Sequence, residues 1–395
     1  MNHVVVVGAG LAGVRSVEAL RAHGFDGEIT LVGEEPHRPY DRPPLSKAVL
    51  TGETDSTYVD SDLDAMEVQR RLGVVAKGLR EGVLETTEGE IPYDGLVIAT
   101  GAAPVRLRGD GRQHVLRTID DALELRGRLV PGAHVAVVGA GWIGAEVATA
   151  ARKAGCEVTV VEADETPLGM ALGHAIGAYT VPWYEQAGVR LLLSRLVASV
   201  DQGGLTLADG DFVEADVVVT GVGVRPAVGW LAGSGVRLDN GVVTDEHLRT
   251  SMPGVVAVGD CAAWWSRRYG RRLRVEHWDT ALGAPDVAAA TLLGEDAVYD
   301  PVPYFWSEQF GRMVQYAGYH TGYHAGARCV LRGDPTGDKR WSACWLTGDD
   351  RLTAILTVDW PRDLVQGRRM VERGQRLDVE RLKDPAITLR DSSAA

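Results

Sequence analysis

Two glycine-rich turns of the same type occur in this chain, at residues 8–13 and 139–144, each with the spacing Gly-x-Gly-x-x-Gly. In such a turn the first glycine permits a tight bend, the second lets a pyrophosphate approach the backbone, and the third lets helix and strand pack closely. The helix that follows offers N–H groups and partial positive charge to phosphates. The candidate binding residues are Gly8, Gly10 and Gly13 in the first turn, and Gly139, Gly141, Ile143 and Gly144 in the second.

An acidic residue follows each turn at the end of a second apolar run. These residues are Glu34 and Glu162, each about 20 residues beyond its turn. A carboxylate in this place accepts hydrogen bonds from a ribose 2′-hydroxyl and repels a 2′-phosphate. NADP sites usually offer an arginine, and the residues after Glu162, Ala163 and Asp164, supply none. The second turn is therefore predicted to prefer NADH over NADPH.

The elements that position these residues also occur twice in the same order. A strand-like run, the glycine turn, a helix and an acid-ended strand span 4–34 and again 135–162. A strand ending in Thr-Gly then follows at 96–101 and at 217–221. One glycine turn alone can be a mere tight connection with a surface acid nearby, but the duplication makes that alternative the weaker one. The sequence predicts two dinucleotide sites.

The two dinucleotide-binding units are not expected to lie end to end. Residues 255–260 form another buried-strand pattern after the second unit. In flavoproteins with two dinucleotides, such a strand returns to the first sheet. We therefore expect an α/β fold with two Rossmann-like domains, similar to the two-domain flavoproteins of the glutathione reductase type. The predicted FAD domain is discontinuous, at 1–104 and 225–301, and the NAD domain occupies 105–224.

From residue 302 the pattern changes to short aromatic segments that alternate in polarity. Such alternation predicts strands at 313–316, 340–346 and 352–358, and an amphipathic helix is predicted at 361–373. The region 302–395 is thus predicted to be a third, α+β domain. Its last residues, 383–395, are predicted to be a loose tail.

The composition excludes several classes of function. The net charge of −13 argues against nucleic acid as a partner, because phosphate backbones attract basic surfaces. No apolar run reaches the 18 residues expected of a membrane span, and no signal or transit peptide is evident. The four cysteines are scattered, which argues against an iron–sulfur or zinc site and favours buried thiols in a reducing cytoplasm. No metal site is predicted.

Residues 40–47 occupy the region where flavin disulfide reductases carry a redox-active cysteine pair. This segment contains no cysteine, so electrons are not expected to leave a flavin through a dithiol. Lys47 could instead place a positive charge near the flavin ring and favour its reduced form. A solvated lysine after a proline turn is the alternative, and it is the simpler one when the segment is taken alone.

Five motifs, in this order along almost the whole chain, resemble the oxygenase-coupled, NADH-dependent ferredoxin reductases. This family includes the ferredoxin reductase components of aromatic-ring dioxygenases. The combination is specific, whereas similarity of fold alone would not be. The motifs are Arg-Pro-Pro-Leu-Ser-Lys at 42–47, Leu-Arg-Thr at 116–118, Val-Gly-Asp-Cys-Ala at 258–262, Glu-His-Trp at 276–278 and Phe-Trp-Ser-Glu-Gln at 305–309.

The resemblance implies FAD contacts that spacing alone does not assign. Arg42 and Lys47 would lie along the pyrophosphate and flavin, and Asp260 would form a hydrogen bond to the ribityl chain or on the pyrophosphate side. Trp278 would present its backbone N–H to the pyrimidine edge of the flavin. The full set implied is Ala12, Glu34, Arg42, Lys47, Arg117, Asp260 and Trp278.

The resemblance also implies three residues close to the reaction. Glu146, two residues beyond Gly144, matches an acid near the nicotinamide that pairs with Lys47. Trp306 matches a tryptophan of the C-terminal domain beside the isoalloxazine, on the route of outgoing electrons. Several of the ten tryptophans are expected to be ordinary core aromatics, but the motif around Trp306 favours the functional role.

An arginine cluster interrupts this otherwise acidic chain. Five arginines lie within eight residues with no acid among them: Arg267, Arg268, Arg271, Arg272 and Arg274. Ferredoxins are usually strongly acidic, so the cluster could be a docking patch that steers association. A solvated loop is an equally good interpretation, because charge runs are usually just solvated.

The function that the resemblance implies is NADH:ferredoxin oxidoreduction. FAD would take a hydride from NADH and pass single electrons to an iron–sulfur ferredoxin, most simply of the 2Fe-2S type. That ferredoxin would feed a haem-thiolate monooxygenase or a ring-hydroxylating dioxygenase. Rubredoxin, a quinone or oxygen are alternative acceptors, and a redox-switched interaction protein similar to apoptosis-inducing factor is the alternative of another class. The family suggests a monomer or weak dimer.

Overall fold

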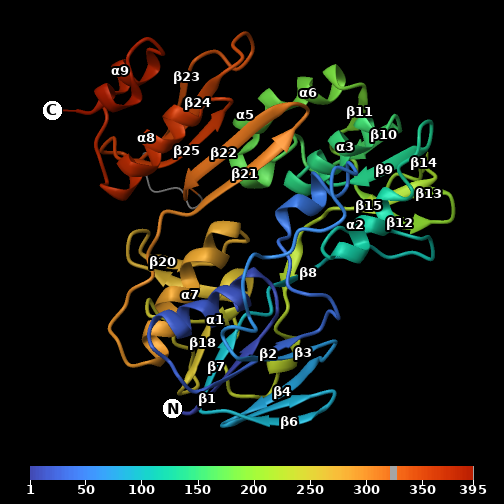
Figure 1. The fold of residues 1–395 in the computed structure, drawn as a ribbon. Coiled ribbons are helices and arrows are strands. Elements are labelled where there is room, and N and C mark those ends of the chain that lie inside the picture. Colours follow the sequence, from blue (N-terminus) through green and yellow to red (C-terminus); the bar gives the residue numbers. More distant parts are fainter. Residues whose placement is uncertain (321–326, 395) are drawn as a thin grey trace. The chain divides into compact units, whose positions relative to one another are not determined.

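The computed structural model describes residues 1–320 and 327–394, which divide into two compact units (Figure 1). Unit 1 comprises Met1–Asp41, Ser56–Ala103 and Val224–Pro303. Unit 2 comprises Arg42–Asp55, Pro104–Gly223 and Tyr304–Ala395. The three predicted domain ranges stay a prediction. By packing, however, residues 42–55 and the C-terminal region belong with the second dinucleotide-binding fold.

Unit 1 is built on a five-stranded parallel sheet. Valines 4–7 of its central strand are almost fully buried, as expected where both faces of a parallel sheet are covered. Figure 1 shows α1 (Leu11–Ala22) and α7 (Trp278–Leu292) packed side by side on this sheet. In spatial order the strands are β18 (Val255–Ala257), β7 (Gly95–Ile98), β1 (His3–Val7), β2 (Glu28–Gly33) and β3 (Val68–Leu72). The predicted return of the strand near residue 255 to the first sheet is confirmed.

Unit 1 also contains smaller sheets, one of which pairs only β16 (Val224–Pro226) with β8 (Ala102–Pro104), while the other two have three strands each. Of these two, one is an antiparallel meander, and the other contains an antiparallel pair that carries the arginine cluster. The meander consists of β4 (Ala76–Arg80), β5 (Val83–Thr86) and β6 (Gly89–Pro92). The other sheet consists of β17 (Val242–Val243), β19 (Ala262–Ser266) and β20 (Arg271–Leu273).

Unit 2 repeats the same plan around a four-stranded parallel sheet. Helix α3 (Trp142–Lys153) follows its central strand, and α2 (Ile119–Arg126) begins with a capping box formed by Thr118 and Asp121. In spatial order the strands are β11 (Val189–Leu192), β10 (Glu157–Val161), β9 (His134–Val138) and β15 (Val217–Thr220). An antiparallel sheet adds β12 (Val197–Asp201), β13 (Gly204–Leu207) and β14 (Phe212–Glu214). The prediction of two dinucleotide-binding folds is confirmed.

The C-terminal part of unit 2 is a five-stranded antiparallel sheet covered by one main helix. Helix α8 (Pro361–Glu372) packs on β22 and β25, which confirms the predicted α+β class and the predicted helix. In spatial order the strands are β21 (Tyr304–Gln309), β22 (Arg312–Gly318), β25 (Leu352–Val358), β24 (Trp341–Leu346) and β23 (Arg328–Arg332).

One hydrophobic core joins this sheet to the segment that follows β10. Trp183 in α6 (Val181–Gln186) and Leu172 in α4 (Gly169–Leu172) share a buried cluster with Val314 and Trp341 of the sheet. Removal of such side chains from water is the main force that holds the two parts together. The C-terminal sheet therefore packs as one unit with the second dinucleotide-binding fold.

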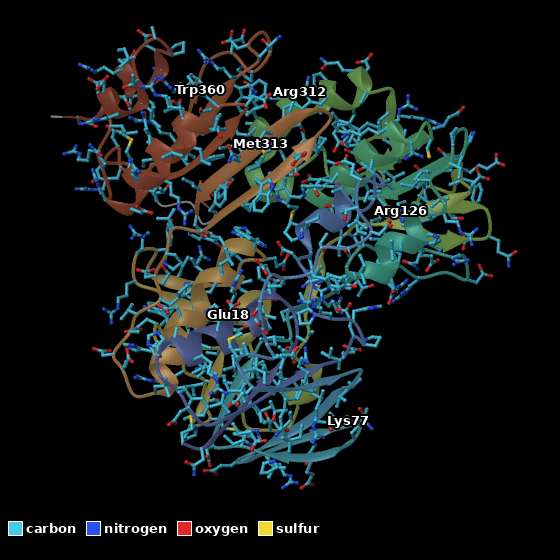
Figure 2. The ribbon with its side chains drawn as sticks, viewed as in Figure 1. Glu18, Lys77, Arg126, Arg312, Met313 and Trp360 are labelled. Atoms are coloured by element: carbon cyan, nitrogen blue, oxygen red, sulfur yellow. The ribbon has the colours of Figure 1, made fainter. Side chains whose placement is uncertain are left out.

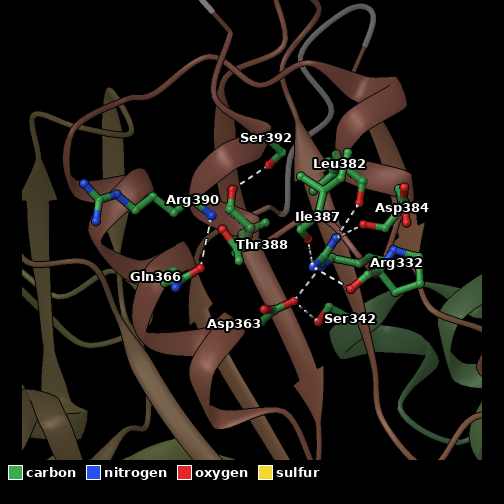
Figure 3. Close-up of polar contacts among 12 residues, drawn as sticks. Arg332, Ser342, Asp363, Gln366, Leu382, Asp384, Ile387, Thr388, Arg390 and Ser392 are labelled. Carbon is green, nitrogen blue, oxygen red and sulfur yellow. Dashed lines mark hydrogen bonds and ion pairs between the residues drawn. The ribbon is translucent and has the colours of Figure 1, made fainter.

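The predicted loose tail is wrong for the described residues up to 394. Arg332 is 1% exposed and forms an ion pair of 2.7 Å between its Nε and Asp363 Oδ2. Its remaining guanidinium nitrogens donate to backbone carbonyls of the tail, among them those of Asp384 and Ile387 (Figure 3). Leu389, in a 3-10 turn after α9 (Val379–Lys383), is fully buried. A buried arginine needs acceptors for all its donors, and the tail supplies them.

Candidate functional site

The first glycine turn lies in unit 1 between β1 and α1. Gly8 has φ +116°, and a Cβ there would lie 2.2 Å from Ala99 O. A Cβ on Gly13 would lie 1.8 Å from Gly8 O, so both positions need glycine. A Cβ on Gly10 would meet nothing within 4 Å, and Gly10 caps α1 with no side-chain hydrogen bond. An open, uncapped helix N-terminus of this kind fits the pyrophosphate of a dinucleotide.

The second glycine turn repeats this geometry in unit 2. A Cβ on Gly144 would lie 1.9 Å from Gly139 O, whereas a Cβ on Gly141 would meet nothing within 4 Å. Gly141 caps α3 without a side-chain hydrogen bond. Ile143, in the first turn of α3, is 41% exposed. This turn therefore fits a second dinucleotide in the same way.

The two predicted acids lie where their turns require them. Glu34 is exposed directly after β2, and Gly8 N donates to Val32 O of that strand at 2.7 Å. Glu162 follows β10, and its carboxylate accepts from Ala140 N at 2.6 Å and from Asp164 N at 2.8 Å. These two backbone N–H groups hold the Glu162 carboxylate beside the second glycine turn.

Arg195, whose backbone lies close to Glu162, forms ion pairs with other acidic residues. Arg195 N donates to Glu162 O at 2.9 Å, so its backbone is a neighbour of the acid. Its guanidinium forms ion pairs with Asp209 at 2.8 Å and with Asp211 at 2.5 Å. Sequence proximity did not reveal Arg195, because it lies 33 residues along the chain on the segment after the neighbouring strand β11.

Other residues predicted for the first dinucleotide also gather in unit 1. Asp260 follows β18, and a Cβ on the preceding Gly259 would lie 3.1 Å from Ala12 Cβ. Trp278 is the first residue of α7, and its indole Nε1 donates to the Asp41 carboxylate at 2.8 and 3.0 Å. Burial lowers the pKa of the adjacent His277 to about 4, so its imidazole is neutral at pH 7.

The segment 42–55 is anchored to unit 2 along its length. At its start the Arg42 guanidinium donates to the Arg117 carbonyl, which brings these two predicted residues together. At its end Arg126 of α2, labelled in Figure 2, donates to the Val49 and Thr54 carbonyls and forms a 2.7 Å ion pair with Asp55. The sequence did not predict that residues 42–55 pack with unit 2, because in the chain they lie between two strands of unit 1.

A buried polar network lies around Glu146, which is 4% exposed on α3. Lys47 Nζ contacts Glu146 Oε2 at 2.9 Å, so the pair implied by the family resemblance is present. Ser46 Oγ donates to the same oxygen, and Ser307 Oγ donates to Oε1 at 2.6 Å. Neither serine was predicted from the sequence. Their positions beside Lys47 and Trp306, inside two of the quoted motifs, were the available signal.

Trp306 lies half-buried on β21 and stacks on Tyr304 with ring centroids 6.1 Å apart. Side chains alternate along a strand, so Phe305 and Ser307 project to the opposite face from Trp306. On that face Phe305 packs edge-to-face with Trp142 of α3, with ring centroids 4.5 Å apart. One face of strand β21 therefore packs against α3, the helix that follows the second glycine turn, and Trp306 lies on the opposite face of the strand.

The arginine cluster is less uniform than the sequence suggested. Arg267 forms a 2.7 Å ion pair with Glu246, and Arg274 forms one of 2.7 Å with Glu276. The guanidinium of Arg272 donates to the Ala263 carbonyl at 2.9 Å. At least three of the five charges therefore have local partners supplied by neighbouring segments of unit 1.

The cysteines and possible metal ligands give a partial correction. Cys156, Cys261 and Cys344 are buried as predicted, but Cys329 on β23 is exposed, so the prediction that all four are buried is wrong. Burial raises the pKa of the Cys261 thiol, which keeps it protonated. Within residues 1–320 and 327–394 no group of three or more histidines, cysteines and acids is placed to hold a metal. In the same residues no helix combines the length and apolar character needed to cross a membrane.

Comparison with known proteins agrees with this architecture over the whole chain. Residues 2–284 match the family described as pyridine nucleotide-disulphide oxidoreductase, and residues 304–393 match the family described as reductase C-terminal. The chain is 36% identical to the anthranilate 1,2-dioxygenase system ferredoxin–NAD(+) reductase component of Burkholderia cepacia, with 98% of each chain covered.

Several solved structures are similar in fold and sequence. Fdr9 matches with a TM-score of 0.94 and 49% identity, covering 98% of this chain and 99% of that one. The covalent putidaredoxin reductase–putidaredoxin complex matches with a TM-score of 0.94 and 31% identity, covering 99% of this chain and 97% of the matched chain. The chain therefore belongs to the pyridine nucleotide-disulphide oxidoreductase family and, within it, to the ferredoxin–NAD(+) reductases that serve oxygenase systems.

Proposed function

We propose that this chain is an FAD-dependent NADH:ferredoxin oxidoreductase that supplies electrons to an oxygenase. The observation that carries the proposal is the pair of open glycine turns, at Gly10 and Gly141, in a chain whose whole length matches ferredoxin reductases. When bound, FAD accepts a hydride from NADH and releases the two electrons singly to an iron–sulfur acceptor. The segment around Lys47 has no cysteine pair to divert these electrons.

On the NADH side, the residues of unit 2 bind and orient the cofactor. Gly139, Gly141, Ile143 and Gly144 surround the α3 N-terminus, which attracts the pyrophosphate. Glu162, fixed by two backbone N–H groups, accepts the ribose hydroxyls and excludes a 2′-phosphate. Preorganised donors and acceptors of this kind reduce the entropy that binding must remove.

On the FAD side, the roles implied by the family resemblance are taken over residue by residue. Gly8, Gly10 and Gly13 form the pyrophosphate cradle, and the neighbouring side chains select and orient the rest of the cofactor. The Lys47 ammonium, paired with Glu146, is the positive charge proposed to act at the reacting end, and Trp306 is proposed on the route of outgoing electrons. The remaining proposed contacts are Ala12, Glu34, Arg42, Arg117, Asp260 and Trp278.

The proposed electron acceptor is a 2Fe-2S ferredoxin. One of the similar structures is a reductase covalently joined to putidaredoxin, and the similar curated proteins are named as ferredoxin reductases, which together support a ferredoxin as the partner. The proposed docking patch consists of Arg267, Arg268, Arg271 and Arg272 on the β19–β20 hairpin. Arg268 lies in the turn of this hairpin and Arg271 directly after it, and both are exposed, so a test begins with them. A cytoplasmic monomer or weak dimer stays our prediction.

The central test is anaerobic stopped-flow mixing of the purified holoprotein with NADH, with NADPH, and then with a 2Fe-2S ferredoxin. We expect rapid bleaching of the flavin band with NADH, much slower bleaching with NADPH, and reoxidation by the ferredoxin. A colourless protein, or a flavin indifferent to NADH, would contradict the proposal. If NADH reduces the flavin but ferredoxin does not reoxidise it, the electron acceptor would instead be rubredoxin, a quinone or oxygen. Slow turnover with every carrier, together with NADH-dependent dimerisation, would favour the redox-switched interaction protein.

Charge reversal tests the docking patch separately. The double variant Arg268→Glu, Arg271→Glu is expected to slow ferredoxin reduction about tenfold or more at low salt, since steering by complementary charge raises association rates by 10–10³-fold. Ferricyanide reduction should stay unchanged. Lys77→Glu, on the exposed meander strand β4 (labelled in Figure 2), is the matched control. An unchanged rate and salt dependence with ferredoxin in the double variant would refute the patch.

A further inference from the structure

The network around Glu146 links three separate segments of unit 2. Lys47 and Ser46 come from the 42–55 segment, Glu146 from α3, and Ser307 from β21 of the C-terminal sheet. The two carboxylate oxygens have different partners. Oε2 receives Lys47 Nζ at 2.9 Å together with the Ser46 hydroxyl, and Oε1 receives the Ser307 hydroxyl at 2.6 Å. The C-terminal sheet therefore holds the oxygen that the lysine does not.

A second buried residue of β21 continues the chain. Gln309 Nε2 lies 3.1 Å from Ser307 Oγ, and both side chains are 1% exposed. Ser307 has one hydroxyl proton, and it donates that proton to Glu146, so it can only accept from Gln309. The amide must therefore turn its NH₂ group toward Ser307. This leaves Gln309 Oε1 buried with no hydrogen-bond partner among the described residues.

That orphaned oxygen argues against a role in packing alone. A buried polar atom without a partner is destabilising, and an apolar side chain of similar size would avoid it. What the glutamine does supply is an N–H that fixes the Ser307 hydroxyl in the orientation that donates to Glu146. The hydrogen bond to an ionised acceptor is the stronger type, so it defines the carboxylate torsion well.

We propose that Ser307 and Gln309 are positioning residues for the NADH half-reaction. They hold Glu146 Oε1, so that Oε2 stays directed at Lys47, and the Lys47 ammonium is kept in one place. This inference rests on the proposed function of Lys47 and Glu146 at the reacting end of the site. It assigns to the C-terminal sheet a part in the reaction with NADH, in addition to the proposed electron exit at Trp306.

The strand geometry allows the two roles to be separated by mutation. Ser307 and Gln309 lie on one face of β21, and Trp306 lies on the other. Removal of the Ser307 hydroxyl therefore leaves the Trp306 face unchanged. The reaction with NADH and the reaction with ferredoxin are expected to respond differently to the same substitution.

The experiment compares holoprotein variants Ser307→Ala, Ser307→Thr and Gln309→Met with Ser342→Ala as control. Ser342 is a fully buried serine of the same sheet, and its hydroxyl lies 3.4 Å from Asp363, outside the network. We measure flavin reduction by NADH in stopped flow, and reoxidation of photoreduced flavin by ferredoxin. An independent readout is the rate at which acetic anhydride acetylates Lys47, followed by peptide mass spectrometry.

For Ser307→Ala we expect flavin reduction by NADH to slow about tenfold, as for loss of one hydrogen bond to a charged group. Lys47 acetylation should become faster, and ferredoxin reoxidation should match the wild type. Ser307→Thr should restore the first two properties, Gln309→Met should show a smaller change in the same direction, and Ser342→Ala should show none.

Two results would overturn the inference. One is wild-type reduction and acetylation rates in Ser307→Ala. The other is an equal loss in both half-reactions and in Ser342→Ala, which would indicate a general effect on the fold. Failure of the proposed function itself looks different, because the wild-type protein would then not react with NADH at all.

Discussion

Replacement of Glu162 by glutamine tests how this chain distinguishes NADH from NADPH. The carboxylate is fixed by Ala140 N and Asp164 N, so its position relative to a bound ribose is well defined. Glutamine keeps one acceptor oxygen and the size of the side chain but removes the charge. We expect binding of NADPH to improve and binding of NADH to weaken moderately.

The magnitude follows from two contributions. A phosphate monoester carries about −1.5 to −2 charges at pH 7, and at about 4 Å each is repelled by a carboxylate by about 1 kcal/mol in a water-like dielectric. Loss of the charged acceptor for the ribose hydroxyl adds about 1 kcal/mol against NADH. Together these amount to about 3 kcal/mol, or a reduction of about a hundredfold in the preference for NADH over NADPH. Full inversion is not expected, because the Arg195 guanidinium is paired with Asp209 and Asp211.

The assay is the dependence of the anaerobic flavin reduction rate on NADH and on NADPH concentration, which yields a dissociation constant for each. Glu157→Gln is the matched control, since Glu157 is exposed at the other end of β10. Five residues of strand separate it from Glu162 by about 16 Å, which exceeds the screening length of about 10 Å at 0.1 M salt. A Glu162→Gln variant with unchanged selectivity would refute the assignment of Glu162, as would an equal effect of Glu157→Gln.

Two further predictions concern the stability of the C-terminal sheet. Asp363→Ala should cost about 3 kcal/mol in urea unfolding followed by tryptophan fluorescence, because it leaves the buried Arg332 without its ion-pair partner. Glu380→Ala, which breaks an exposed pair with Lys383, should cost at most about 1 kcal/mol, and equal losses would contradict the argument. Burial lowers the pKa of His320 to about 4, so the unfolded chain binds this proton more tightly than the folded chain does between about pH 4 and 6.5. The melting temperature should therefore fall as the pH is lowered through this range, and His320→Phe should show a shallower fall if the ring stack on Trp345 is kept.

Local sequence was sufficient to predict the two dinucleotide turns and their acids. Gly13 and Gly144 are required by a contact between a turn and the helix that it begins, which is a property of six consecutive residues. The acid-ended strands follow from the same βαβ unit, so Glu34 and Glu162 lie where spacing placed them. The return of residues 255–257 to the first sheet was predictable because a fully apolar strand must be buried between neighbours.

Long-range packing decided what the sequence could not. In the sequence, residues 267–274 carry five like charges with no acid among them. In the structure, Arg267 pairs with Glu246, 21 residues earlier in the chain, and Arg272 donates to a backbone carbonyl of β19. The C-terminal tail reads as loose because its polar residues have no local periodicity, and it is ordered by the carbonyl acceptors that it offers to Arg332, 50 or more residues earlier.

The sequence by itself determined the chemistry class, through two glycine turns, two acids and the motifs around Lys47 and Trp306. Only the tertiary structure brought the Ser307 hydroxyl to the carboxylate of Glu146, 161 residues away, and the Gln309 amide to that hydroxyl. The physical reason is that a turn and its helix are stabilised by contacts between near neighbours, which spacing records. The orientation of a buried carboxylate depends on donors that the fold brings from distant segments, and no local pattern records which donors those are.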